Sequence, residues 1–212
     1  MIKNITIVST GRTGTKSLAY SLNKLPDITA THEKLSDITR RVSNGLWDNT
    51  ITEEQALELL NKRVEAKPNN IWVDVNCLLW NCLYLIDNNK ICYIYITRNK
   101  KDTIESFLAT DFYGKNKLPW SKRAQSGFID IRKPSYSLED QRQNCIKAYD
   151  IRTKRIEEQL RNIEHNRWIH VKFEDMIASK DAQKTILDFI SLKTDIDIDP
   201  QKFHLVHEHK KC

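Results

Sequence analysis

The segment near the N-terminus constrains the fold of this chain more than any other stretch. An apolar run at residues 5–8 gives way to a loop rich in Gly and Thr that holds Arg12 and Lys16, and a helix-like pattern follows from Leu18. This order predicts a strand, a tight loop and the start of a helix. Backbone N–H groups in such a turn converge on one point, and the helix start adds partial positive charge. The loop therefore favours a phosphate or sulfate group as its ligand.

The loop departs from the ATP- and GTP-binding form G-x-x-x-x-G-K-[ST]. With Lys16-Ser17 in register, that form requires Gly at positions 10 and 15, and both residues are threonine. The stretch from Arg12 to Leu18 reads Arg-Thr-Gly-Thr-Lys-Ser-Leu, and it resembles the 5′-phosphosulfate loop of the sulfotransferases, (Lys/Arg)-Ser-Gly-Thr-(Thr/Ser)-x-Leu. The resemblance implies that the sulfate donor 3′-phosphoadenosine 5′-phosphosulfate (PAPS) is bound by Arg12, Thr13, Gly14, Thr15, Lys16 and Ser17.

A second segment points to a second phosphate. The apolar run 91–97 reads as a buried parallel strand, Arg98 follows it at once, and Ser106 comes eight residues later. Ligands of open α/β sheets bind beyond the carboxyl ends of the strands, and a guanidinium with a hydroxyl suits a phosphate. An Arg, seven intervening residues and a Ser resemble the 3′-phosphate site of the same family. The resemblance implies that Arg98 and Ser106 distinguish PAPS from ordinary adenine nucleotides.

A third stretch agrees with the first two. Residues 167–176 and 185–190 resemble the late strand and helix of the sulfotransferases. We expect a structural role here, with Phe173 and Phe189 in the core and Glu174 or Asp175 near a helix start. The resemblance thus runs from about residue 5 to about residue 192, with specific motifs at three places.

The chain also departs from the family pattern. Gly11 stands where Pro usually precedes the loop cation, Lys16 replaces a Thr or Ser, and Lys100 replaces a common Pro. A late Gly-rich segment, which contacts the 3′-phosphate in soluble small-molecule members, has no counterpart. That contact could come from other cations, namely Lys122, Arg123, Lys210 and Lys211.

Hydrophobic patterning predicts one α/β domain over residues 1–212, with a mostly parallel central sheet flanked by helices. The resemblance implies that this is the P-loop-like fold of the sulfotransferases. Strands are expected near residues 4–9, 28–31, 70–75, 92–97 and 168–172. Helices are expected at Thr15–Asn23, Thr52–Glu65 and Leu138–Asn162, and Thr52 with Gln55 forms a capping-box pattern. The chain has 212 residues and 40% hydrophobic content, enough for a full core.

The first residues lead straight into a strand, and no apolar run approaches the roughly 18 residues that span a bilayer. We therefore expect a soluble cytoplasmic protein with no membrane span. The five cysteines lack metal-finger spacing and are expected to be reduced thiols, with Cys212 alone exposed. The C-terminal His204, His207 and His209 lack a diagnostic metal spacing, so no metal site is assigned.

The net charge of +6 fits a polyanionic cofactor or an acidic acceptor, and it would equally fit weak nucleic-acid binding. The resemblance favours the first, so we expect no nucleic-acid partner. Residues 111–136 contain six of the cations, namely Lys115, Lys117, Lys122, Arg123, Arg132 and Lys133. We interpret this segment as a lid over the cofactor or as a loop that binds the acceptor. The alternative is a solvated charged loop.

Transfer of a sulfuryl group to a hydroxyl or amine acceptor needs a held donor, a cation beside the transferring group and a base. The resemblance assigns Arg12 as that cation, and the in-line scheme requires no metal. Residues 25–33 resemble the turn and short strand that lead to a catalytic Glu in tyrosyl-protein and heparan-type sulfotransferases, and Glu33 falls 21 residues after Arg12. Glu33 is the first candidate base, with His32 and Asp74 as alternatives.

Two other functions stay open at this point. Asp74, which ends an apolar run, could be the magnesium-side aspartate of a kinase or nucleotide hydrolase with a degenerate loop. Asn76 stands near the position of the catalytic His of soluble small-molecule sulfotransferases and cannot act as a base. A third possibility is a non-catalytic module that binds a nucleotide or polyanion, which would need Arg98 but not Glu33.

Overall fold

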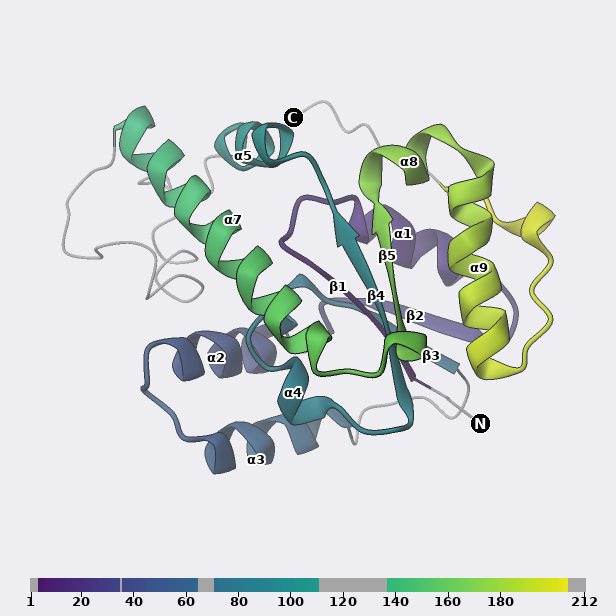
Figure 1. The fold of residues 1–212 in the computed structure, drawn as a ribbon, viewed down its shortest axis with the longest axis horizontal. Coiled ribbons are helices and arrows are strands. Elements are labelled where there is room, and N and C mark those ends of the chain that lie inside the picture. Colours follow the sequence, from purple (N-terminus) through teal and green to yellow (C-terminus); the bar gives the residue numbers. More distant parts are fainter. Residues whose placement is uncertain (1–3, 35, 65–70, 111–136, 206–212) are drawn as a thin grey trace.

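A computed structural model of the chain describes residues 4–34, 36–64, 71–110 and 137–205. Its centre is a five-stranded sheet in the order β2-β3-β1-β4-β5, in which every neighbouring pair is parallel (Figure 1). The strands are β1 (Asn4–Ser9), β2 (Ile28–His32), β3 (Ile71–Val75), β4 (Ile91–Thr97) and β5 (Trp168–Lys172). The predicted α/β class and the five predicted strands are confirmed.

The strand order places β1 in the middle of the sheet. The chain leaves β1 toward the edge strand β2, returns to β3, and then crosses β1 to form β4 and β5. Connections on the two sides of β1 therefore run in opposite directions, and open α/β sheets bind ligands beyond the carboxyl ends of the strands at such a point. The loop predicted to bind an anion follows β1 directly.

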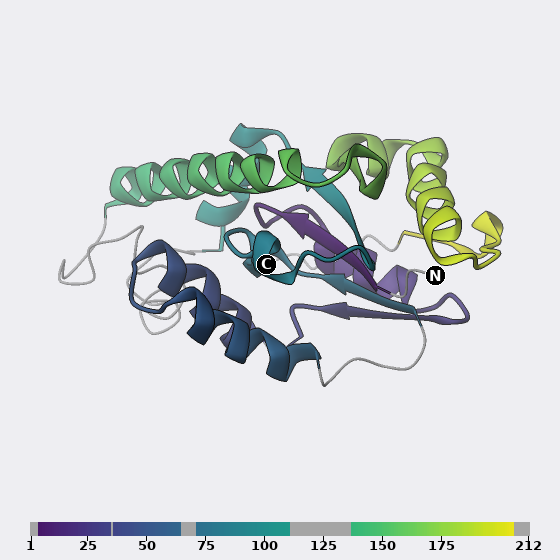
Figure 2. The ribbon, with the colours of Figure 1, turned by 60° about the horizontal axis from the view of Figure 1, so that its bottom comes forward.

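Helices cover both faces of the sheet (Figure 2). In β4, Cys92, Ile94 and Ile96 face one way, while Tyr93 and Tyr95 face the other, because successive side chains of a strand alternate. The first face packs against α1 (Thr15–Leu22), α8 (Phe173–Ala178) and α9 (Lys180–Thr194). The second packs against α2 (Ser36–Trp47), α3 (Glu53–Val64), α4 (Leu83–Ile86), α5 (Lys100–Leu108) and α7 (Leu138–Arg161). A sheet covered on both faces explains the continuous apolar runs in the sequence.

Caps fix the predicted helix starts. The Thr52 hydroxyl accepts from the Gln55 N–H at 3.3 Å and the Gln55 side chain accepts from the Thr52 N–H at 3.0 Å, so the capping box of α3 is confirmed. Ser137 and Asp140 form a second capping box at the start of α7. The predicted ends of α1 and α7 lie one residue beyond the observed ones, because Asn23 and Asn162 are the C-caps.

Helix α2 is absent from the sequence prediction. Its buried residues include polar ones, such as Arg40 and Ser43. The Ser43 hydroxyl donates to the Leu78 carbonyl, and the Ser43 backbone carbonyl accepts from Asn81 Nδ2 at 3.2 Å. The helix nevertheless carries the apolar repeat of a surface helix, because Ile38, Val42 and Leu46 recur every four residues and pack against the second face of the sheet. The sequence prediction overlooked this repeat.

Cys77, Cys82, Cys92 and Cys145 are buried free thiols, as predicted. Cys212 and the basic segment 111–136 lie outside the described residues. Within the described parts of the chain, no helix combines the length and the apolar character needed to cross a bilayer.

Candidate functional site

The loop between β1 and α1 has the backbone of a tight turn. Gly11 has φ +95°, Arg12 +59° and Gly14 +68°, all in the left-handed region. Gly14 is the N-cap of α1, and no side chain caps this helix start. A helix start without a side-chain cap leaves its first N–H groups available to a ligand.

Two threonine hydroxyls lie buried in this loop. Thr10 is 1% exposed and Thr13 is fully buried, and neither Oγ1 has a hydrogen-bond partner among the described residues. Buried hydroxyls are normally paired, and an unpaired one costs free energy. The loop thus holds two donors that an oxyanion can satisfy. Thr10 supplies such a donor at a position where the ATP-binding form has Gly.

The structure brings Arg12, Arg98 and Ser106 together, although they are far apart in the sequence. The Arg12 Nε donates to Ser106 Oγ at 3.0 Å, and Arg98 Nη1 donates to the Arg12 carbonyl at 2.8 Å. Arg12 comes from the loop, Arg98 follows β4, and Ser106 lies on α5. Two guanidinium groups and a hydroxyl therefore meet beside the loop, at the carboxyl edge of the sheet.

Phe173 does more than fill the core. It is partly buried, and the Arg98 guanidinium lies 5.0 Å from the centre of its ring. A Cβ added at Gly14 would come within 2.5 Å of Phe173 Cε2. Its neighbour Glu174 accepts from the Asn99 N–H at 2.8 Å. The third sequence motif therefore supports the site directly, beyond its predicted role in the core.

Helix α7 also holds the site, which the sequence did not reveal. Arg152, 3% exposed, donates from Nη1 to the Thr10 carbonyl at 3.1 Å. Tyr149 donates from its hydroxyl to the Arg98 carbonyl at 3.0 Å. The sequence feature that could have identified Arg152 is its place in the apolar stripe of α7, among Cys145, Ala148 and Ile156.

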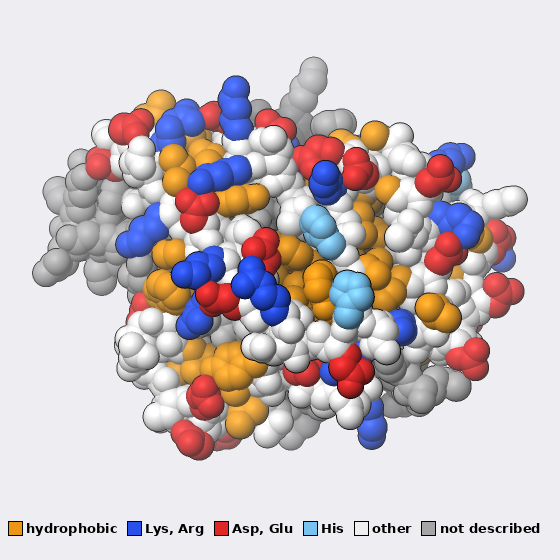
Figure 3. Space-filling model, in the orientation of Figure 1, with side chains coloured by type: hydrophobic (Ala, Val, Ile, Leu, Met, Phe, Trp, Pro, Cys, Tyr) orange, Lys and Arg blue, Asp and Glu red, His pale blue; other side chains and the backbone are white. Residues whose placement is uncertain are grey.

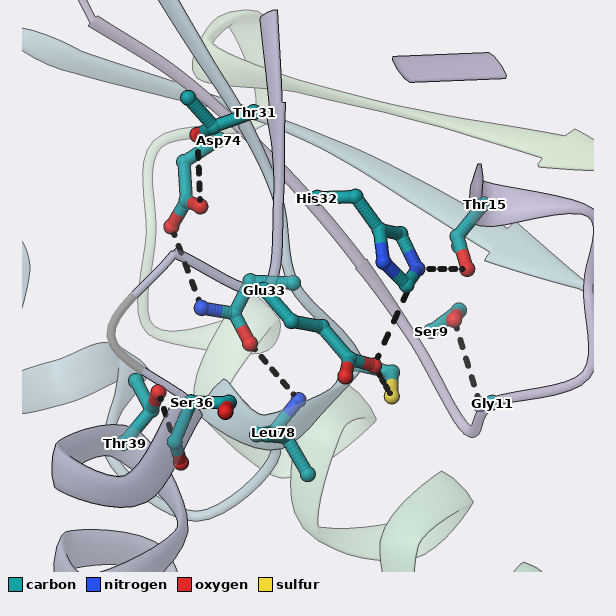
Figure 4. A network of polar contacts seen from close by, with 12 residues as sticks. Ser9, Gly11, Thr15, Thr31, His32, Glu33, Ser36, Thr39, Asp74 and Leu78 are labelled. Carbon is teal, nitrogen blue, oxygen red and sulfur yellow. Dashed lines mark hydrogen bonds and ion pairs between the residues drawn. The ribbon is translucent and has the colours of Figure 1, made fainter. Parts of the chain in front are cut away.

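Glu33 and His32 lie at the end of β2 (Figure 4). The Glu33 N–H donates to the Val75 carbonyl at 3.0 Å, and the residue has φ +49°. Its Oε1 accepts from Cys77 Sγ at 2.8 Å and lies 3.9 Å from His32 Nε2. The same imidazole nitrogen lies 3.1 Å from Thr15 Oγ1, at the first turn of α1. A chain of polar contacts therefore joins the candidate base to the loop.

Burial sets the protonation state of His32 and Cys77 in this series of contacts. It lowers the pKa of His32 below its ordinary value; the Glu33 carboxylate opposes this shift and the Lys16 ammonium adds to it. Burial also raises the pKa of the Cys77 thiol well above its usual range, and the Glu33 carboxylate contributes to the increase. Near neutral pH the imidazole is uncharged and the thiol keeps its proton.

Asp74, the third candidate base and the candidate magnesium ligand, lies apart from the loop. It is 1% exposed, accepts from Thr31 Oγ1 at 3.5 Å and accepts from Asn76 Nδ2 at 3.5 Å. Figure 4 shows it on the opposite side of Glu33 from Thr15. These two contacts join the ends of β2 and β3.

The other residues considered in the sequence analysis are on the surface, partly buried, or outside the described residues. Lys16 is exposed and Ser17 half-buried on the first turn of α1. His204 is exposed, whereas His207, His209 and four candidate cations lie outside the described residues, namely Lys122, Arg123, Lys210 and Lys211. No group of three or more His, Cys, Asp and Glu side chains that could hold a metal occurs in the described ranges.

The face seen in Figure 3 carries charges of both signs, and apolar side chains gather over the sheet between α7 and α9. Lysine and arginine side chains on it alternate with Asp and Glu. The net positive charge of the chain therefore forms no continuous basic surface among the described side chains of this face.

Comparisons with known proteins agree with the fold. No protein-family model matches the sequence, and no curated protein sequence matches it. Among solved structures, a sulfotransferase domain from the curacin biosynthetic pathway matches with a TM-score of 0.58 and 13% sequence identity, over 95% of this chain and 77% of that one. The chain has a sulfotransferase-like fold. At this identity the likeness concerns the fold, so the chemistry must be argued from the site.

Proposed function

We propose that this chain is a sulfotransferase that moves a sulfuryl group from PAPS to a hydroxyl or amine acceptor. The observation that carries the proposal is the meeting of Arg12, Arg98 and Ser106 beside an uncapped helix start. Two fixed cations, a hydroxyl and free N–H groups suit a ligand with phosphate at two places. PAPS is such a ligand, and ADP is not.

The residues present fit the donor. The N–H groups at the start of α1 and the unpaired Thr10 and Thr13 hydroxyls would hold the 5′-phosphosulfate. Arg98 and Ser106 would hold the 3′-phosphate. Arg12 would stabilise the charge that develops on the bridging oxygen as the sulfur–oxygen bond breaks.

The contacts of His32 favour Glu33 as the base. A carboxylate oxygen 3.9 Å from His32 Nε2 favours the tautomer with the proton on that nitrogen. Nε2–H then donates to Thr15 Oγ1, which lies 3.1 Å away, and the Thr15 hydroxyl proton is left for the donor. In this scheme His32 positions Thr15, and the Glu33 carboxylate takes the proton of the acceptor.

The first test is ligand-induced stabilisation. We would measure thermal shifts with adenosine 3′,5′-bisphosphate, with ADP and with ATP plus Mg²⁺, since a ligand at about 100 times its dissociation constant stabilises by roughly 2.7 kcal/mol. The proposal predicts a shift with the bisphosphate that exceeds the other two, followed by transfer of labelled sulfate from PAPS to an acceptor.

The variants Ser106→Ala and Asp74→Asn separate the proposal from its main rival. A sulfotransferase should lose bisphosphate affinity with Ser106→Ala and retain most of it with Asp74→Asn. A preference for ATP with Mg²⁺, together with the reverse order of damage, would replace the proposal with a kinase or nucleotide hydrolase.

A further inference from the structure

Cys77 occupies a fixed place between the loop and Glu33. It is the first residue of the short 3₁₀ helix η1 (Cys77–Leu79), which follows β3 by one residue. The intervening Asn76 donates its N–H to the Ile7 carbonyl at 2.8 Å and accepts from the Leu78 N–H at 3.0 Å, so the backbone here is held on both sides. A Cβ added at Gly11 would lie 3.7 Å from Cys77 Sγ.

The Cys77 thiol is a hydrogen-bond donor to the candidate base. Its Sγ lies 2.8 Å from Glu33 Oε1, and the residue is 9% exposed. Burial keeps the pKa of this thiol high, while the Arg152 guanidinium acts in the opposite direction. The proton therefore stays on sulfur, and the carboxylate is the acceptor.

The two oxygens of Glu33 have different surroundings. Both recorded contacts of the carboxylate, with the Cys77 thiol and with His32 Nε2, go to Oε1. Among the described residues, Oε2 has no hydrogen-bond partner. An oxygen that is fixed through its neighbour and itself uncommitted is in the condition that a general base requires.

We propose that Cys77 is a positioning residue for Glu33: its thiol holds Oε1, and Oε2 is the oxygen that takes the proton of the acceptor. The inference rests on the proposed function. In the step that it serves, the acceptor O–H or N–H bond breaks and its proton goes to Oε2. The acceptor atom bonds to sulfur, the bond from sulfur to the bridging phosphate oxygen breaks, and adenosine 3′,5′-bisphosphate leaves.

The contact can be tested without catalysis, by infrared spectroscopy of the S–H stretch. This band lies apart from other protein bands and moves to lower frequency as the hydrogen bond strengthens. The difference spectrum of wild type minus Cys77→Ala isolates the Cys77 band. Glu33→Gln should move that band to higher frequency, because an amide oxygen is a weaker acceptor than a carboxylate. A band that Glu33→Gln leaves in place would overturn the proposal.

The functional part is tested by kinetics. A positioned general base contributes roughly 10²- to 10⁴-fold, so we expect Cys77→Ala to lower kcat by about tenfold while KM for PAPS stays nearly constant. Cys77→Ser keeps a donor and should recover most of the loss. The matched control is Cys82→Ala, since Cys82 is also a buried cysteine and its Sγ donates to the Leu79 carbonyl.

The outcomes separate the two proposals. Equal losses of kcat in Cys77→Ala and Cys82→Ala, or no recovery with a folded Cys77→Ser, would overturn the positioning role. If the infrared band shifts but the wild-type protein transfers no sulfate, the contact stands, and the proposed function fails together with the role of Glu33 as base.

Discussion

Two regions of the site are built from opposite chemistry. The donor region contains the loop after β1, Arg98 and Ser106, and it presents cations, hydroxyls and N–H groups. The base region contains Glu33, His32 and Cys77 at the ends of β2 and β3, and it presents a carboxylate beside an imidazole and a thiol. Both regions lie at the carboxyl edge of one parallel sheet.

The difference shows how one sheet edge can serve an anion and a base together. An anion site gains from every positive charge nearby, whereas a carboxylate that must accept a proton is weakened as a base by a direct guanidinium partner. Among the described residues, Glu33 receives its contacts from a thiol and an imidazole. Arg98 instead donates to the Arg12 carbonyl. The parallel topology separates the two regions, since β2 lies two strands away from β1.

The largest effect should come from the base region. Glu33→Gln keeps the shape of the side chain but removes the proton acceptor, so kcat for sulfuryl transfer should fall by about 10²-fold or more. Affinity for adenosine 3′,5′-bisphosphate, measured by calorimetry, should stay within about twofold. A variant that loses binding and turnover equally would show that the two regions are not separate.

A smaller effect, confined to binding, should come from the donor region. Hydrogen bonds to charged groups contribute about 1.5–3 kcal/mol, so Arg98→Met should weaken bisphosphate binding by roughly 10- to 100-fold and affect ADP binding less. Arg161→Met, at an exposed position on α7, is the matched control. Equal losses for the two nucleotides would contradict the assignment of Arg98 to the 3′-phosphate.

Gly14→Ala tests whether the backbone of the donor region is specifically required. Its Cβ would lie 2.5 Å from Phe173 Cε2 at a residue with φ +68°. We expect a loss of about 1–3 kcal/mol in the free energy of unfolding, or roughly 2–4 °C in Tm for each kcal/mol. In a Phe173→Leu background the loss should be smaller, because the ring is removed and only the backbone strain remains. If Gly14→Ala lowers the free energy of unfolding equally in both backgrounds, the strained φ angle accounts for the whole effect.

The smallest effect concerns pH and His32. Its pKa in the folded protein is lowered by burial below the ordinary 6.5, so the unfolded chain binds more protons just below that pH. The stability that the neutral imidazole contributes is complete above about pH 6.5 and is lost as the pH falls through the folded-state value. Urea unfolding at a series of pH values should show this decline, and His32→Gln should reduce it.

His170 serves as the reference for this pH experiment, since burial and Lys172 lower its pKa too. It contributes with the same sign, so the double variant should show a flatter pH dependence than either single variant. A decline that His32→Gln leaves unchanged would mean that the imidazole is not held neutral beside the base.

Local sequence signals predicted the parts of the site that lie within one segment. The loop at residues 10–17, the Arg98–Ser106 pair and the capping boxes each depend on neighbours no more than about eight residues away. Helix α2 was not predicted, although Ile38, Val42 and Leu46 recur at helical spacing and pack against the second face of the sheet. The local signals also missed Arg152 and Cys77, because each acts on a residue more than 40 positions away.

The sequence by itself determined the parallel α/β class, the loop that follows β1 and the residue types available for an anion and a proton. Apolar runs, caps and glycine positions are properties of short segments, because they depend on interactions between residues close together in the sequence. The tertiary structure alone decided which side chains meet: Arg12 with Ser106, Arg98 with Phe173, and Glu33 with Cys77. These contacts depend on the order β2-β3-β1-β4-β5, which aligns the ends of strands from distant parts of the chain.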